Sequence, residues 1–159
     1  MTRKEQYNQL ILQIAGLIKD ETNLVGILAN VSAALHDTFP ERFFWVGFYL
    51  QVHGNMLRLG PFQGSVACYT IPFGKGVCGK AWEEERTLIV PDVEKFPGHI
   101  ACSSLSRSEI VVPMYDDSHT FRGVLDIDST RLNDFNEDDK EGLERIIELL
   151  MEETQDLFQ

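Results

Sequence analysis

Basic residues are scarce in this sequence, and its apolar residues never gather into a long run. Lys and Arg number 14 against 25 Asp and Glu, which gives a net charge of −11, and no cluster of basic residues occurs. Binding to phosphate backbones or anionic membranes depends on positive charge, so nucleic acid and membrane surfaces are unexpected partners. No apolar stretch approaches the ~18 residues of a membrane span, and the polar first residues do not resemble a signal peptide. We therefore expect a cytoplasmic protein.

Cysteine is also scarce, with three residues and no C-x-x-C pair. An odd number of cysteines in a reducing compartment disfavours a framework of structural disulfides. The missing C-x-x-C pair weakens the case for zinc and leaves redox chemistry or plain packing. His99 and Cys102 form an H-x-x-C half-site, but no second half-site of similar spacing exists, so no metal is expected.

No linker, repeat or low-complexity segment divides the chain, so a single domain over residues 1–159 is expected. Helical spacing of apolar residues and helix-start signals predict helices at 3–20, 22–37, 77–84 and 136–155. Asp20 or Thr22 is the expected cap of the second helix, and Asn136 or Asp134 that of the last. Alternating or short apolar patterns predict strands at 43–50, 56–60, 67–72, 88–90, 108–114 and 121–128. Strands framed by helices indicate an α+β fold, with an antiparallel sheet and the terminal helices packed on one face.

The first predicted strand carries large aromatics on both faces. One face would hold Phe44, Val46, Phe48 and Leu50, and the other Trp45, Gly47 and Tyr49. Trp45 and Tyr49 are core residues by default, but Gly47 between them leaves a notch that raises the chance of a pocket. The residues that follow the second strand, 60–64, are predicted to form a loop.

The last predicted strand carries two aspartates on one face. Asp126 and Asp128 alternate with apolar residues, although aspartate is depleted in strands and two on one face repel each other. They lie either on a solvated face or in a cup of carboxylates, which Glu109 on the partner strand could join. Clustered carboxylates raise one another's pKa, so one of them could stay protonated and act as an acid, while the others bind an amine.

The three cysteines stand in different surroundings. Cys102 lies in a loop rich in serine, which is no core pattern and favours a reactive thiol. Cys78 shares the apolar face of a short helix, where packing is the better interpretation, and Cys68 stands at a loop–strand junction. His99 either biases the Cys102 thiol towards thiolate or is an ordinary surface histidine.

Six stretches together resemble the free methionine-(R)-sulfoxide reductases, small stand-alone enzymes with a GAF domain. The stretches are Trp45–Tyr49, Leu59–Gly64, Gly74–Gly79, Phe96–Cys102, Ser108–Pro113 and Gly123–Ser129. The resemblance covers nearly the whole chain. It implies a GAF fold with a six-stranded antiparallel sheet, a homodimer, and thioredoxin as the external reductant, with no bound cofactor.

The resemblance also implies roles for individual residues. Cys102 matches the catalytic cysteine, Cys68 the resolving cysteine, and Cys78 a third, candidate redox cysteine whose part is less settled. The family's acidic pocket residues correspond to Glu109, Asp126 and Asp128 in this sequence. Its aromatic pocket residues correspond to Trp45 and Tyr49. Two positions depart from the family pattern, since Ser103 replaces an aspartate and Glu94 a histidine.

The implied reaction can be written from these side chains. The Cys102 thiolate attacks the sulfoxide sulfur, a shared carboxylic acid supplies a proton, and methionine leaves with Cys102 oxidised to a sulfenic acid. Cys68 then condenses with it to a disulfide, which a dithiol opens. Backbone N–H groups around Ile100 and Ala101 are candidates for the substrate carboxylate. The alternatives are a GAF module that binds a small ligand and a thiol redox sensor.

Overall fold

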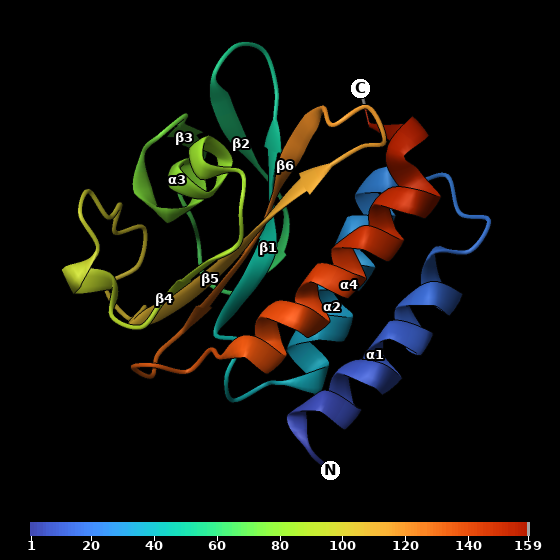
Figure 1. Cartoon of the computed structure of the whole chain (residues 1–159), viewed down its shortest axis with the longest axis horizontal. Helices are drawn as coiled ribbons and strands as arrows, with labels where there is room; N and C mark the ends of the chain where they lie inside the picture. The colour runs from blue at the N-terminus through green and yellow to red at the C-terminus, as the bar shows by residue number, and fades with distance from the viewer. Residues whose placement is uncertain (159) are drawn as a thin grey trace.

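The computed structural model describes residues 1–158, which form a six-stranded antiparallel sheet with helices on both faces (Figure 1). The helices are α1 (Arg3–Ile18), α2 (Leu24–Thr38), α3 (Gly76–Glu84) and α4 (Glu137–Thr154), with 3₁₀ turns η1 (Val93–Lys95) and η2 (Gln155–Leu157). The strands are β1 (Trp45–Gln51), β2 (Met56–Gln63), β3 (Thr70–Pro72), β4 (Leu88–Val90), β5 (Ser108–Tyr115) and β6 (Phe121–Ser129). Their order across the sheet is β3-β2-β1-β6-β5-β4, so the first and last long strands, β1 and β6, pair at its centre.

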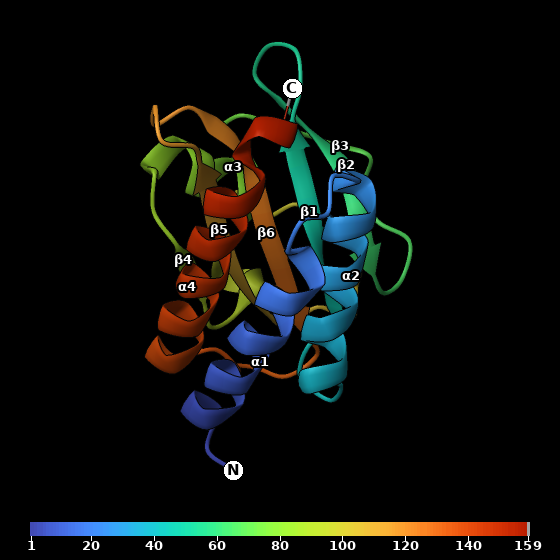
Figure 2. The ribbon, with the colours of Figure 1, turned by 90° about the vertical axis from the view of Figure 1, so that its right-hand side faces the viewer.

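The two faces of the sheet carry different layers. Helices α1, α2 and α4 lie together over one face, and α3 with the segment around η1 lies on the other (Figures 1 and 2). The predicted α+β arrangement, with the terminal helices on one face of an antiparallel sheet, is therefore confirmed. No helix within residues 1–158 is both long enough and apolar enough to cross a membrane.

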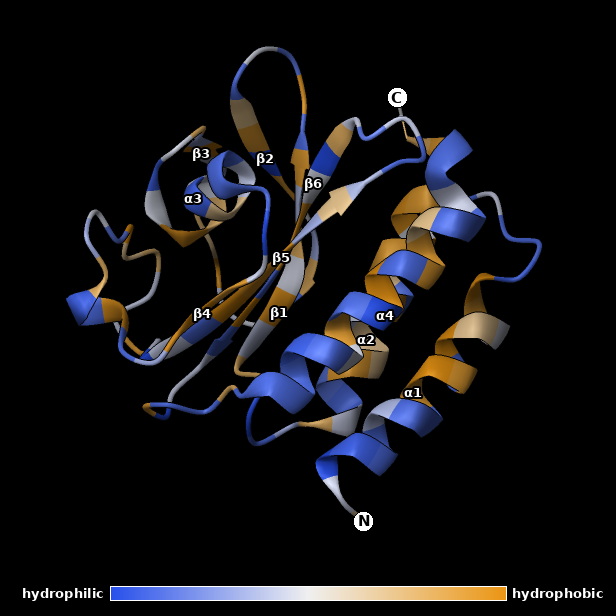
Figure 3. Cartoon of the chain, in the orientation of Figure 1, coloured by the Kyte–Doolittle hydropathy of each residue, from blue (hydrophilic) through white to orange (hydrophobic). Residues whose placement is uncertain are grey.

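Alternation along the central strands separates two apolar clusters. Val46 and Phe48 of β1 face the three-helix layer, where the helices turn their apolar stripes inward (Figure 3). Trp45 and Tyr49 face the other way, into a second cluster with α3. The predicted assignment of side chains to the two faces of this strand is confirmed except at Phe44. That residue precedes β1 and packs with the second cluster. Because one strand supplies both clusters, its register decides which side chains reach the site.

Two predicted boundaries near the start and middle of the chain are wrong. The N-cap of α2 is Asn23, whose side chain accepts a hydrogen bond from the Gly26 N–H at 3.2 Å, and not Asp20 or Thr22. Asp20 instead takes a left-handed conformation (φ 61°) in the turn between the helices. The predicted loop at 60–64 is largely strand, since β2 continues to Gln63 and pairs with Val46. That extension depends on tertiary pairing with β1, which local turn residues do not reveal.

The predicted strand at 67–72 begins only at Thr70. Cys68 lies outside it because its backbone and side chain have other partners. The Tyr49 hydroxyl donates to the Cys68 carbonyl at 2.9 Å, and the Cys68 sulfur is bonded to Cys102. The remaining boundaries agree with prediction to within a few residues, and Asn136 is the cap of α4, one of the two residues expected.

A buried ionic cluster fastens α1 and α4 to the sheet. Asp139, in the first turn of α4, is fully buried and accepts hydrogen bonds from Arg42 at 2.9 and 3.0 Å, from the Tyr7 hydroxyl at 2.6 Å and from Arg3 at 2.9 Å. Arg42 lies between α2 and β1, so a single carboxylate joins three segments. Removing one partner of a buried pair leaves an uncompensated charge, which is strongly destabilising.

We expect Asp139→Asn to lower the free energy of unfolding by roughly 3 kcal/mol, because the buried Arg42 guanidinium loses its counter-charge. Urea unfolding followed by circular dichroism measures this. Glu137→Gln, in the same helical turn but exposed, is the matched control and should change stability by less than ~0.5 kcal/mol. Equal losses in the two variants would show that the cluster does not fasten the helix.

Candidate functional site

Three neighbouring strands place the polar side chains of the site in adjacent cross-strand rows. Asp128 of β6 stands opposite Trp45 of β1 on one side and opposite Glu109 of β5 on the other. In the next row on this face, Asp126 stands opposite Gly47. Side chains directly opposite in an antiparallel pair are close neighbours, so the sheet register itself gathers the three carboxyl groups on the face that carries α3.

Burial decides between the two interpretations of these aspartates. Glu109 and Asp126 are each only 5% exposed, and Asp128 is partly exposed. The solvated face is therefore excluded for Asp126, and the carboxyl groups form a cup. Within residues 1–158, the Oδ1 atom of Asp126 is buried without a hydrogen-bond partner. A buried acceptor without a partner is costly, and such an atom suits a ligand that brings a donor or a cation.

The pKa of each carboxyl group in the cup is raised. Burial is the main cause for all three, and the charge of Asp126 adds to it for Glu109 and Asp128. The pKa of the Cys78 thiol is raised well above its usual value by burial and then by Asp126. A carboxyl group with a raised pKa keeps its proton to higher pH, so the cup can supply an acid near neutrality.

The notch at Gly47 is not the pocket. A side chain there would collide with Phe62, which pairs with Gly47 across β1 and β2. The Phe62 ring stacks on Trp45 with centroids 5.1 Å apart. Gly47 is needed because it lets the two backbones approach closely, so the notch itself is filled. The pocket that Gly47 made more probable does exist, lined by Trp45 and Tyr49 on either side of it.

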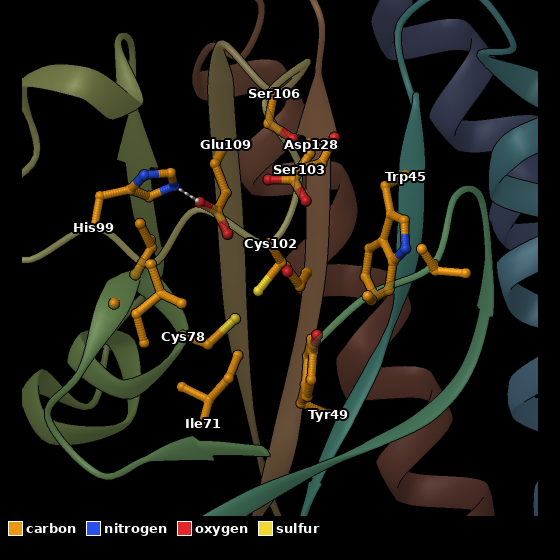
Figure 4. A pocket seen from close by; sticks show the side chains of 16 residues that line it. Trp45, Tyr49, Ile71, Cys78, His99, Cys102, Ser103, Ser106, Glu109 and Asp128 are labelled. Atoms are coloured by element: carbon orange, nitrogen blue, oxygen red, sulfur yellow. Dashed lines mark ion pairs between the residues drawn. The ribbon is translucent and has the colours of Figure 1, made fainter. Parts of the chain in front are cut away.

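The cavity lies beside that notch, between the sheet, α3 and two loops (Figure 4). The lining residues are Trp45, Tyr49, Val66, Ala67, Ile71, Gly76, Val77, Cys78, His99, Ile100, Cys102, Ser103, Ser106, Glu109, Asp126 and Asp128. All predicted site residues except Cys68 and Ala101 are among them. The space open to the centres of water molecules is about 40 Å³, enough for a few waters.

Ala101 was predicted to border the substrate, but it is exposed and does not line the cavity. Its neighbours Ile100 and Cys102 turn inward instead. The Cys102 N–H donates to the Ile100 carbonyl at 3.2 Å, so that group is already engaged in a tight turn. In this conformation the turn does not offer the full set of N–H groups that the loop sequence suggested.

A disulfide joins Cys68 to Cys102, with their Cα atoms 5.5 Å apart. It links the segment before β3 to the loop before β5, beside the cavity. Both pocket aromatics hold the first segment, since Trp45 Nε1 donates to the Ser65 carbonyl at 3.0 Å and Tyr49 donates to Cys68. The polar ends of these aromatics therefore position Cys68, while their rings border the cavity.

Cys78 and His99 lie at the inner wall and the rim of the cavity (Figure 4). Cys78 is 3% exposed and free, as packing on α3 predicts, but its sulfur also reaches the carboxyl cup. His99 Nε2 lies 3.8 Å from Glu109 Oε1. Burial lowers the pKa of His99, so its neutral form is favoured at pH 7.

Two serines in the lining were not predicted as site residues. Ser106 faces the cavity, and the Ser103 hydroxyl accepts from the Leu105 N–H at 3.2 Å. Ser103 thus makes the turn contact that an aspartate at this position could make. Glu94, the second departure from the family pattern, is exposed and lies outside the lining. The serine-rich composition of the loop was the only sequence signal for these two lining residues. Composition alone does not show which hydroxyl points into the cavity.

The comparisons with known proteins agree on one family. The GAF domain family matches residues 21–151. GAF domain-containing protein A of Dictyostelium discoideum is 57% identical over 94% of this chain and 92% of its own. The free methionine-R-sulfoxide reductase of Saccharomyces cerevisiae is 43% identical over 94% of this chain and 86% of its own.

Comparison with a solved structure indicates the same family. The free methionine-R-sulfoxide reductase from Neisseria meningitidis, in complex with its substrate, superposes with a TM-score of 0.93 at 46% identity, covering 98% of this chain and 92% of that one. The chain belongs to the free methionine-R-sulfoxide reductase family. Its fold is the GAF domain, as the resemblance implied.

We expect the oxidised protein to contain the Cys68–Cys102 disulfide and one thiol, Cys78, that is shielded by the fold. Iodoacetamide should leave the native oxidised protein unlabelled and should modify Cys78 alone after denaturation, because only unfolding exposes that sulfur. Peptide mapping by mass spectrometry identifies the modified residue. Labelling of Cys68 or Cys102 under these conditions would contradict the pairing.

Proposed function

We propose that the protein reduces free L-methionine-(R)-sulfoxide to L-methionine. The observation that carries this proposal is that the Cys68–Cys102 disulfide borders, through Cys102, a cavity lined also by Glu109, Asp126 and Asp128. A nucleophilic thiol, a partner thiol and a protonated carboxyl group are the three things that thiol-based reduction of a sulfoxide needs. The names of the Saccharomyces and Neisseria relatives supply the substrate class.

The cup suits the free amino acid as a substrate. Its carboxyl groups would hold the substrate ammonium, and the unpartnered Oδ1 of Asp126 is available as an acceptor. The Trp45 ring, which stacks with Phe62 and with Tyr49 and lines the cavity, would pack against the methyl group. A peptide-bound methionine has no free ammonium and must bring flanking backbone into a small cavity. Both features favour the free amino acid over peptide-bound substrate.

The proposed reaction balances as follows. The Cys102 thiolate attacks the sulfoxide sulfur, and a protonated carboxyl group of the cup, with Glu109 in first place, protonates the oxygen. Two electrons pass from the Cys102 sulfur to the substrate, methionine leaves, and Cys102 carries the oxygen as a sulfenic acid. Cys68 then attacks the Cys102 sulfur, and the oxygen departs as water. The product of this step is the disulfide seen here.

Thioredoxin is the proposed reductant, since an external dithiol can open the disulfide by exchange and no resident cofactor is required. The surface beside the disulfide supports this. Val66, Tyr69 and Leu105 are 89, 76 and 59% exposed and flank the two cysteines in sequence. No Asp or Glu occurs in residues 60–80 or 96–108, although the chain carries 25 acidic residues. An apolar, acid-free surface of this kind suits docking of a reductant protein.

Two further parts of the proposal concern the assembly of the protein and its compartment. We infer a homodimer, for which Leu12 on α1 and Val25 on α2, 75 and 68% exposed, are candidate interface residues. The cytoplasm is the proposed location, because a cycle that ends in a disulfide needs a supply of reduced thioredoxin.

We expect Cys102→Ser to abolish turnover, because serine cannot take up the sulfoxide oxygen, while the circular dichroism spectrum stays unchanged. Cys68→Ser should release about one methionine per chain in a burst and then stall with thioredoxin, since no disulfide can form. Amino-acid analysis after mixing with free (R)-sulfoxide measures both.

The controls are Cys78→Ser and the (S)- and peptide-bound sulfoxides. Cys78→Ser should retain thioredoxin-dependent turnover, and neither alternative substrate should be reduced. Turnover by Cys102→Ser would overturn the assigned nucleophile. Rapid oxidation of Cys102 by peroxide without any sulfoxide turnover would instead make the protein a redox sensor.

We expect kcat to fall as pH rises through the raised pKa of the carboxyl cup. The group must be protonated to act as an acid, so its contribution to the rate is present below its raised pKa and is lost above it, whereas the need for the Cys102 thiolate gives the opposite limb at lower pH. Glu109→Gln should lower kcat by roughly 10²–10⁴-fold and remove the descending limb, as stopped-flow rates of methionine release would show. Glu94→Gln, exposed and outside the cavity, is the control. An unchanged profile in Glu109→Gln would move the acid to Asp126 or Asp128.

A further inference from the structure

Cys78 takes no part in the proposed cycle, yet its sulfur reaches the carboxyl cup. Three possible ligand atoms, the Cys78 sulfur and one carboxylate oxygen each from Glu109 and Asp126, lie within 4.8 Å of one another. All three residues are buried. They come from α3, β5 and β6, which pack directly together. A thiol and two carboxyl groups that converge in this way form the donor set of a metal ion.

A second, independent observation points to a ligand at this place. Asp126 Oδ1 is buried, lacks a hydrogen-bond partner among residues 1–158 and belongs to a residue that is 95% buried and lines the cavity. An unpaired buried oxygen is destabilising unless a donor or a cation meets it. The space for water centres, about 40 Å³, is large enough for an ion with one or two waters.

The donor types select the ion. Ca²⁺ and Mg²⁺ take oxygen ligands, whereas a mixed set of one sulfur and two carboxylate oxygens suits Zn²⁺. Zn²⁺ binds sulfur at ~2.3 Å and carboxylate oxygen at ~2.0–2.2 Å. The ligand atoms, now within 4.8 Å of one another, must therefore close in by a small amount, which rotation about the side-chain torsions of Glu109 can supply. Water can fill the fourth position.

We propose that Cys78, Glu109 and Asp126 form a Zn²⁺ site, and that the bound ion excludes the substrate. The ion would displace the protons of these groups and occupy the carboxylates that the substrate ammonium needs. Binding of the ion stands on the geometry alone. Only its inhibitory consequence rests on the proposed reductase function.

The oxidised protein permits a direct test with Co²⁺ as the probe. Cys68 and Cys102 are then joined, so Cys78 is the only thiol, and a thiolate-to-Co²⁺ charge-transfer band in the near ultraviolet reports its ligation. We expect one equivalent of Co²⁺ to bind per chain and Zn²⁺ to displace it. The band should vanish in Cys78→Ser and in Cys78→Ala, and Asp126→Asn should weaken binding at least ~10-fold, the loss of one good ligand.

Glu94→Gln is the matched control, since it removes an exposed carboxylate outside the cavity and should bind Co²⁺ like the unmodified protein. Circular dichroism shows that each variant is folded. Absence of the band in the unmodified oxidised protein would overturn the proposal. So would a band that persists in a folded Cys78→Ser or Cys78→Ala variant.

Competition is tested in the Cys68→Ser, Cys102→Ser double variant, which keeps Cys78 as its single thiol and cannot turn over substrate. Free methionine-(R)-sulfoxide should raise the apparent Kd of Co²⁺ in proportion to its concentration. A Co²⁺ band that the sulfoxide does not weaken would overturn the shared site. Failure of sulfoxide turnover in the unmodified protein, with the Co²⁺ band intact, would instead refute the reductase function and leave the metal site standing.

Discussion

The crowding of three carboxyl groups, two of them in buried residues, on one face of the sheet is the constraint on which the site depends. Pairing of β6 with both β1 and β5 places Asp126, Asp128 and Glu109 side by side, where like charges repel and water is largely excluded. The electrostatic cost of the cup falls when its carboxyl groups keep their protons, which is why their pKa values are raised. An ammonium group or a metal ion bound in the cup would lower the repulsion between the carboxylates in the same way. The same electrostatic repulsion therefore underlies the proposed proton supply, the proposed binding of the substrate ammonium and the proposed Zn²⁺ site.

The scaffold is divided so that this costly arrangement does not weaken the fold. The three-helix layer supplies an apolar core on one face and is fastened by the buried cluster around Asp139 and Arg42. The face with α3 carries the smaller apolar cluster and the cavity. The carboxyl cup and the ionic cluster around Asp139 therefore lie in different layers of the protein.

The two loops over the cavity are held by different means. Trp45 and Tyr49 fix the backbone at Ser65 and Cys68 through hydrogen bonds from a rigid central strand. The loop of Cys102 has local turns of its own, such as the one capped by Ser103, and is joined to the first loop by the disulfide. The first loop is therefore tied to the sheet by two hydrogen bonds as well as by the disulfide.

The sequence by itself determined the α+β class, most element boundaries and the facing of Asp126 and Asp128, because strand alternation and helical period are local properties. It did not show that β2 continues to Gln63, that Phe62 fills the space at Gly47, or that Ala101 turns outward. Those outcomes depend on which strands pair and in which register. A local sequence pattern does not contain that information. Convergence of Cys78 on the carboxyl cup likewise exists only once α3 packs on β5 and β6.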